Sequence, residues 1–357
     1  EKKRSKIRKI LLRSLLLLVF LMSVLAVLTR NRWVQTRISQ YFANEISQSL
    51  GVEVSIQGVE VDFLRNFHFE GFLMKDLHLD TLIYGRTLDF RISDWNMAEN
   101  DFKINHLDAY GLLFRMGNYD GEEKFNYEYV FLEDGSQTNI PLKLSIDDVS
   151  LNQCEYVLFS GTKAHEFNKQ GEFNPSYLRY KQVDASVSGF NLNDQGIVFM
   201  EVNDLATLGR SGQKIDKIST HLTIDGPNLD FQKLEILTGQ TKIIGSLGIK
   251  ELPESKGTYF DKFNYQLRLI KSNISLSDIG YYAPYLKTHR ANFKVTADVF
   301  GPLSNLSSAN IRAVSDQGSN LTFDYKCTGI PEVPHMKHWL TFKNSSFSSS
   351  DIARFFN

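Results

Sequence analysis

Cysteine and proline are both scarce in this chain of 357 residues, which contains two cysteines and eight prolines. Because Cys154 and Cys327 are far apart and lie in unrelated contexts, no disulfide framework can hold the fold together. A single bridge between them would suit an oxidising compartment, but two free thiols buried in strands is the interpretation we favour. No Pro/Ser/Gly-rich linker divides the chain into separate domains.

An excess of charge of either sign is also missing, with 40 Lys and Arg residues against 41 Asp and Glu residues. Beyond the basic N-terminal tail the two signs are interspersed, which is typical of a solvated surface. The composition therefore predicts no nucleic-acid partner.

Catalytic motifs are absent as well, since the chain has no GxSxG, P-loop, HExxH or CxxC sequence. His335 and His338 have a spacing that a metal could use, but no carboxylate or cysteine stands at ligand spacing beside them. The adjacent acids Asp147 and Asp148 would point to opposite faces of a strand and make a poor acid/base pair. We therefore predict no enzyme activity, no catalytic residue and no metal site.

The chain does contain one long apolar run, from Ile10 to Leu28, preceded by six Lys and Arg residues among the first nine. A helix of about 18 to 20 apolar residues can cross a hydrocarbon core of about 30 Å. Because basic flanks stay in the cytoplasm, we predict a cytoplasmic tail over residues 1–9, a single-pass anchor over residues 10–29 and export of the remainder. The expected anchoring residues are Leu15, Leu16, Leu17, Leu18, Val19, Phe20, Leu21, Leu25, Leu28 and, at the interface, Trp33.

A cleavable signal peptide is the alternative interpretation of this run. No A-x-A cleavage site follows it, and the next residues, Thr29 to Arg32, make a poor cleavage neighbourhood. We favour the uncleaved anchor.

Residues 34–50 are predicted to form an amphipathic helix. Apolar side chains recur at three- and four-residue spacing from Val34 to Leu50, and Gly51 is a natural stop. The helix would either cap the core that follows or lie on the outer leaflet of the membrane, and we favour the cap.

From Gly51 onward the apolar period changes from 3.6 to 2, which predicts a succession of half-buried strands over residues 51–357. Leu77 and Leu79 are read as part of this pattern, and a change of parity at Asp147 and Asp148 indicates a bulge. No long helices alternate with the strands, which argues against a doubly wound enzyme fold. The pattern favours one elongated antiparallel sheet with occasional short helices.

One internal repeat pairs NISLSDIGYYAPYL, which begins at Asn273, with SSFSSSDIARFF, which begins at Ser345. Ser277 and Ser350 would act as N-caps of two short helices, and Asp278 and Asp351, 73 residues apart, would favour their first turns. Because the second copy ends the sequence, we expect the N-terminal part of a longer protein.

Four stretches in order carry a resemblance to a known family: VQTRISQYFANEISQSLGVEVSIQGVEVDF behind the apolar run, INHLDAYGLLFRMGNYDGEEKFNY, IPLKLSIDDVSLNQCEYVLF and HLTIDGPNLDFQKLEILTGQTKIIGSLGIK. This order resembles the N-terminal region of the AsmA/TamB family of Gram-negative envelope proteins, of the TamB-like type found in Bacteroidota. The resemblance covers nearly the whole chain, but the C-terminal domain of the family is absent.

The resemblance implies a sheet folded lengthwise into an open apolar groove, called the repeating β-groove or β-taco. It implies an inner-membrane anchor, a periplasmic body, phospholipids that slide along the groove, and an outer-membrane barrel partner reached through a C-terminal region not present here. No cofactor is implied apart from bound phospholipid. The residues expected to line the groove are Val54, Ile56, Val61, Phe63, Phe90, Leu144, Ile146, Leu151, Val187, Ile224, Leu267 and Val295.

Three functions follow from these predictions. A lipid-conducting bridge needs an unbroken apolar face, and we favour it. A scaffold for assembling outer-membrane proteins needs an accessible strand edge instead. An anchored enzyme or glycan-binding protein needs converging polar groups, which the sequence does not reveal. The residues expected to line the groove could also fill a closed core and meet no ligand.

Overall fold

The computed structural model describes residues 32–62, 65–96, 99, 101–122, 124–131, 143–161, 173–174, 176–252, 259–283, 286–330 and 336–356. The helices are α2 (Arg32–Leu50), α3 (Asn126–Phe131), η1 (Tyr259–Lys262), α5 (Leu276–Ile279) and α6 (Ser349–Phe356). The strands of the N-terminal half are β1 (Val54–Asp62), β2 (Asn66–Lys75), β3 (Thr81–Asn96), β4 (Asp101–Tyr110), β5 (Leu113–Asn118), β6 (Lys143–Ser160), β7 (Tyr177–Leu192) and β8 (Val198–Gly209). Those of the C-terminal half are β9 (Lys214–Ile215), β10 (Lys217–Asp225), β11 (Asn228–Thr238), β12 (Thr241–Glu251), β13 (Phe263–Ser275), β14 (Asn292–Gly301), β15 (Asn305–Ser315), β16 (Asn320–Thr328) and β17 (Lys337–Phe342).

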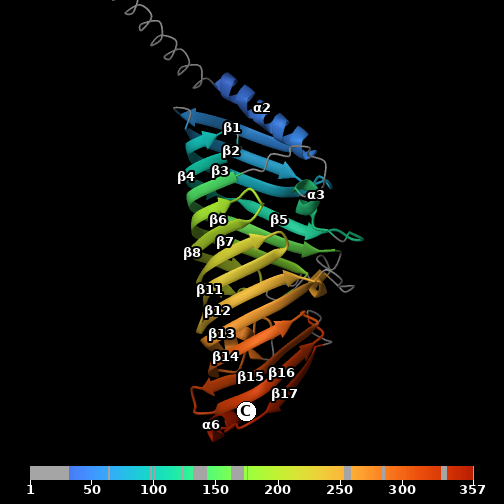
Figure 1. Ribbon diagram of the computed structural model, residues 1–357, viewed down its shortest axis with the longest axis vertical. Coiled ribbons are helices and arrows are strands. Elements are labelled where there is room, and N and C mark those ends of the chain that lie inside the picture. Colours follow the sequence, from blue (N-terminus) through green and yellow to red (C-terminus); the bar gives the residue numbers. More distant parts are fainter. Residues whose placement is uncertain are drawn as a thin grey trace, which may run out of the picture.

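All 17 strands belong to a single sheet. Most strands pair antiparallel with their neighbour in the sequence, so the sheet grows in chain order from β1 at one end to β17 at the other. Figure 1 shows the strands stacked along the long axis of the molecule, with α2 at one end and α6 at the other. The prediction of a mostly β protein built on one long sheet is confirmed.

The prediction that the sheet is antiparallel throughout is wrong at one place. Strands β4 and β5 follow a single line, interrupted at Gly111 with a φ of +62°, and both pair parallel with β6. The connection from β5 to β6 contains α3 and returns the chain to the edge from which β4 started, because a parallel neighbour requires a crossover.

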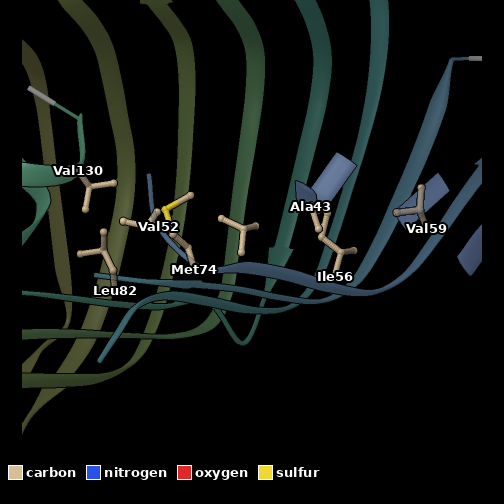
Figure 2. Packing of buried hydrophobic residues seen from close by; sticks show 8 residues of the cluster. Ala43, Val52, Ile56, Val59, Met74, Leu82 and Val130 are labelled. Atoms are coloured by element: carbon tan, nitrogen blue, oxygen red, sulfur yellow. The ribbon is translucent and has the colours of Figure 1, made fainter. Parts of the chain in front are cut away.

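Bulges interrupt several strands, and five of these bulges share one feature. Their central residues have positive φ angles although none is glycine, and each lies at a shift of register: they are Gln153, Gln182, Lys233, Lys271 and Asn310. All five side chains are exposed. A bulge bends its strand, so five of them in one sheet turn the strands away from a straight course. Figure 2 shows the ribbons of several strands following a curved course.

The change of parity predicted at Asp147 and Asp148 occurs, but without a bulge. Ile146 is buried, both aspartates are exposed and Val149 is half-buried. The register of β6 against β4 is nevertheless unbroken across this point. Strands β4, β6 and β7 therefore change parity together, and at this point the register shifts only where β4 meets β3 and where β7 meets β8.

Leu77 and Leu79 do not lie in a strand. They occupy the turn between β2 and β3, where their exposed fractions are 54% and 67% and Leu79 has a φ of +63°. The buried carboxylate of Asp76 organises this turn by accepting hydrogen bonds from the backbone N–H groups of His78 and Asp80, at 2.9 and 3.0 Å. Local side-chain bonds of this kind favour a turn over a strand.

The N-terminal end of the sheet is covered by a helix. Helix α2 ends at Leu50, where Gly51 has a φ of +67°, and packs on β1. The Ser47 hydroxyl accepts a hydrogen bond of 2.9 Å from the N–H of Val54, a group on the outermost strand. Covering an edge strand in this way protects its free backbone groups.

A packed cluster lies where α2 and α3 meet the first strands, and Figure 2 shows it at close range. Its buried members are Ala43, Val52, Val54, Ile56, Val59, Met74, Leu82 and Val130. Among the described residues, which begin at Arg32, no helix has both the length and the apolar character needed to cross a membrane. The anchor predicted over residues 10–29 lies outside them, and Trp33 falls in the first turn of α2.

Three short helices each hold a hairpin turn of the sheet. Asp278 of α5 accepts hydrogen bonds from the N–H of Gln240 and the hydroxyl of Thr241, in the β11–β12 turn, at 2.9 and 2.8 Å. Asp351 of α6 accepts hydrogen bonds from the hydroxyls of Ser315 and Ser319, which flank the β15–β16 turn.

The third helix holds its turn in the same way, with an amide in place of the carboxylate. Asn126, the first residue of α3, donates to Asp76 in the β2–β3 turn at 3.0 Å. The N-caps of the two repeat helices are Ser275 and Ser348, two residues earlier than the predicted Ser277 and Ser350. The N-cap of each helix thus lies two residues before the predicted serine, and the two aspartates bond to hairpin turns of the sheet.

Candidate functional site

Strand β8 shows which residues share the apolar face of the sheet. Val198, Met200 and Val202 alternate along it with Phe199 and Glu201. Val202 is buried and the other two are half-buried, whereas Phe199 is 43% exposed and Glu201 is exposed. Because side chains alternate between faces and directly opposed residues share one, the register of the neighbouring strands extends this face in both directions.

One row of opposed residues passes through Val202 and crosses eight strands. It consists of Val61, Phe67, Phe90, Leu107, Val149, Val187, Val202 and Thr220. Phe90 stacks on Phe67 and Phe69, with ring centroids 5.1 and 5.5 Å apart. The row carries no charged side chain.

A second row passes through Val198. It consists of Trp95, Phe102, Leu144, Leu192, Val198, Ile224, Leu229, Ile249 and Tyr265. A third row passes through Met200 and reaches the last strand. It consists of Met200, Leu222, Phe231, Leu247, Leu267, Val299, Ser308, Tyr325 and Leu340. Together the three rows make one apolar face that continues from β1 to β17.

The residues predicted to line a groove are distributed over this face. Val61, Phe90 and Val187 lie in the first row, Leu144 and Ile224 in the second, and Leu267 in the third. Ile146 lies beside Leu144 on β6, opposite Ile104 and Phe190. Leu151 is opposed to Ala109 and Ala185, and Val295 packs in a cluster with Leu267.

Four predicted residues are buried rather than open: Ile146 and Val187 within the sheet, and Val54 and Ile56 near α2. Val54 and Ile56 are buried in the cluster with Ala43 of α2, so at this end the face forms a closed core. Phe63 lies outside the described residues.

Beyond α3 the face is mixed, with buried members such as Ile146, Val187 and Val202 beside half-buried ones. Among the described residues, the large apolar side chains less than 2% exposed are Leu82 and Val59, and both lie in the cluster with α2 and α3. Ile224, Leu229 and Ile249 are half-buried. The half-buried members leave apolar surface exposed along part of the face.

The tyrosines of this region report an apolar environment. Burial raises the pKa of Tyr265, in the second row, to about 12. Burial likewise raises the pKa values of Tyr156 and Tyr180, which are opposed on β6 and β7, to about 12. Burial disfavours the ionised form of each of these three phenols.

No metal centre is found among the described residues. No three His, Cys, Asp or Glu residues gather there in an arrangement that could hold a metal. His338 is occupied by Tyr325, whose hydroxyl lies 2.8 Å from its Nδ1, and His335 lies outside the described residues. Cys154 and Cys327 are free and buried, as the favoured interpretation predicted.

Sequence reasoning missed most of β8. Val198, Met200 and Val202 do alternate with other residues, but Phe199 between them is also apolar and hides the period. Their role becomes visible only from the register between strands, because each of the three rows passes through β8. In comparisons with known proteins, no family model matches the chain and no curated protein matches it.

Proposed function

We propose that the chain is a membrane-anchored conduit for phospholipid, in which acyl chains move along the apolar face from one end of the sheet to the other. The observation that carries this proposal is the continuity of the three rows, which cross strand after strand without a charged side chain. The TamB-like resemblance of the sequence and the apolar run before Trp33 support an inner-membrane anchor and a periplasmic location.

Energetics explain why such a face would be needed. Exposing one CH₂ group to water costs about 0.8 kcal/mol, so a 16-carbon acyl chain crossing water unaided faces a cost on the order of 10 kcal/mol. A continuous apolar face avoids this cost at every step. Interspersed charges on the opposite side of the sheet keep the protein soluble in the aqueous space. The bulges would fold the sheet lengthwise and partly shield the chain.

Photo-crosslinking at neighbouring positions of β8 tests the proposal. A photoreactive residue at Met200 faces the apolar rows, and one at Phe199 has a similar apolar character but faces the other side. We expect phospholipid to be captured in cells from position 200 and not from position 199. Equal capture at both positions, or none at position 200, would exclude the conduit.

A charge on the apolar face separates an open surface from a closed core. Ile224→Glu should leave a folded protein, because a half-buried carboxylate can reach water, but it should block lipid passage. The adjacent variant Thr223→Glu, on the opposite face, is the matched control and should leave passage intact. If Ile224→Glu is instead degraded, the face is a closed core at this level.

A second candidate function is a scaffold that binds strands of outer-membrane proteins. It is favoured by β17, whose six residues are all exposed, including Trp339, Leu340 and Phe342 at 48, 49 and 46%. Such an edge can accept an extended peptide by strand addition. Phe342→Pro would remove a backbone donor that points outward from this edge, so it should impair protein assembly while leaving lipid capture at position 200 unchanged.

A further inference from the structure

A hollow of about 870 Å³ lies against β10 to β14, and besides residues that alternate with the apolar rows its lining includes Leu229, Ile249, Leu267 and Val299 of those rows. A row of directly opposed residues crosses it on five neighbouring strands. The row consists of Thr223, Asp230, Gly248, Gln266 and Phe300. These residues alternate with members of the apolar rows, such as Ile224 and Leu267, so they point away from the conduit.

Glycine at position 248, in the middle of the row, is not required by the fold. Its φ is not positive, and a Cβ added there would meet nothing closer than the Cβ of Gln266, at 3.8 Å. Gly245, three residues earlier on β12, is different, because a Cβ there would lie 1.7 Å from the carbonyl oxygen of Arg268. A strand glycine without a steric cause weakens the strand and is typical of a place that another molecule approaches closely.

The polar groups around Gly248 are available to a ligand. Gln266, Ser246 and Asp225 line the hollow, and none of their side chains has a partner within the described part of the chain. Asp230 is bonded only by the side-chain amide of Gln232, at 2.8 Å. Hydrogen-bonding capacity therefore faces the hollow unused.

The charged groups and exposed aromatic rings around the hollow limit the chemical class of ligand that it can bind. Four carboxylates line the hollow against two cations, so phosphate groups would be repelled: they are Asp225, Asp230, Glu251 and Asp298 against Lys250 and Arg268. Phe300 closes the row with a ring that is 53% exposed, and Phe199, 43% exposed, stands opposite Thr223 at the other end.

We propose that this hollow binds a neutral saccharide chain that lies along the row, across the strands. Phe300 stacks against the C–H face of one sugar ring, while the Gln266 amide and the Asp230 carboxylate bond to hydroxyl groups, since together they offer donors and acceptors. Five strand spacings of about 4.8 Å separate the two phenylalanines, which gives room for a few sugar units. The hollow also falls within the range of about 300 to 1,000 Å³ typical of ligand sites.

Calorimetric titration of the full chain in detergent micelles tests this site with three probes: chitotetraose, cellotetraose and maltotetraose. We expect saturable binding of at least one. Phe300→Ala and Gly248→Leu should each weaken it by about tenfold or more. The exposed aromatic Tyr110, far away on β4, provides the control Tyr110→Ala, which should bind as the native chain does.

Folding of each variant is checked by its thermal unfolding curve, and Gln266→Ala replaces Gly248→Leu if the latter does not fold. Absence of saturable binding with all three probes would overturn the proposal, as would binding that survives both Phe300→Ala and the second variant. Neither result bears on lipid capture at Met200, so the saccharide site and the conduit can fail separately.

Discussion

Asp278 and Asp351 occupy equivalent places in two copies of one structural unit. Each follows the third strand of a three-stranded segment, begins a short helix and bonds back to the hairpin turn between the first two strands. Asp351 is only 2% exposed. Burial alone would raise the pKa of Asp351, but hydrogen bonds from Ser315, Ser319 and Ser348 outweigh it and hold the pKa below its ordinary value.

The first prediction concerns the acid sensitivity of this contact. A carboxylate whose pKa is lowered by folding stabilises the native state above its unfolded pKa of about 3.9, and that stability is lost as the pH falls through the folded value. Asp351→Asn should therefore lower the free energy of unfolding by about 1.5 to 3 kcal/mol at pH 7. Denaturant melts should show this difference shrinking below about pH 4. A difference that stays constant down to pH 2 would contradict the role assigned to the carboxylate.

The second prediction concerns the bulges. Lys271 has a φ of +46°, a conformation that β-branched residues resist. Lys271→Val should destabilise the protein by about 1 to 2 kcal/mol, whereas Lys271→Gly should be tolerated. The matched control is Lys294→Val, at an exposed position on the regular part of β14. Chemical denaturation of the three variants measures the effect, and equal stability of both valine variants would show that the bulge conformation is unstrained.

The third prediction separates the closed end of the apolar face from the rest. Leu82 is 0% exposed beneath α2 and α3, so Leu82→Ala should cost about 2 to 5 kcal/mol of stability. Leu229→Ala removes the same atoms from a half-buried position in the second row and should cost clearly less. Comparable losses in thermal melts of the two variants would mean that the face is closed at β11 as well.

The fourth prediction concerns topology across the membrane. Because Cys154 and Cys327 are buried, an impermeant thiol reagent should label the native chain weakly. A cysteine introduced as Gln195→Cys, in the exposed β7–β8 turn, should react in cells with a permeabilised outer membrane. One introduced as Ser5→Cys should react only after lysis, and the reverse order of labelling would contradict an N-terminal tail in the cytoplasm.

Alternation of apolar residues along single strands was sufficient to predict a long sheet, since strand period is a local property. The parallel pairing of β4 with β6 could not be predicted, because it depends on where α3 returns the chain. The positive φ angles at Lys271 and Asn310 lie at shifts of register between strands, which have no local signal. The repeat around Asp278 and Asp351 was visible, but the turns they hold are fixed only by register.

The candidate site, like the fold, could be predicted only where it depends on single strands. Leu144 and Ile224 were predicted from their own strands, and each is a member of the same row. That they are separated only by Leu192 and Val198 depends on pairings between strands distant in the sequence. The hollow around Gly248 could not be predicted at all, because its polar residues converge from five strands and form no motif.

Pairing between sequence neighbours also determines how the molecule should respond to force. A pull on the C-terminal end meets one hairpin at a time, so β17, β16 and β15 should peel away in steps, each of them weak. The pairings of β6 with β4 and with β5 would carry this force at the same time, so they must break together. The sheet should therefore unfold strand by strand from its C-terminal end until the force reaches β6. The segment from α2 to β6 should be the mechanically most resistant part.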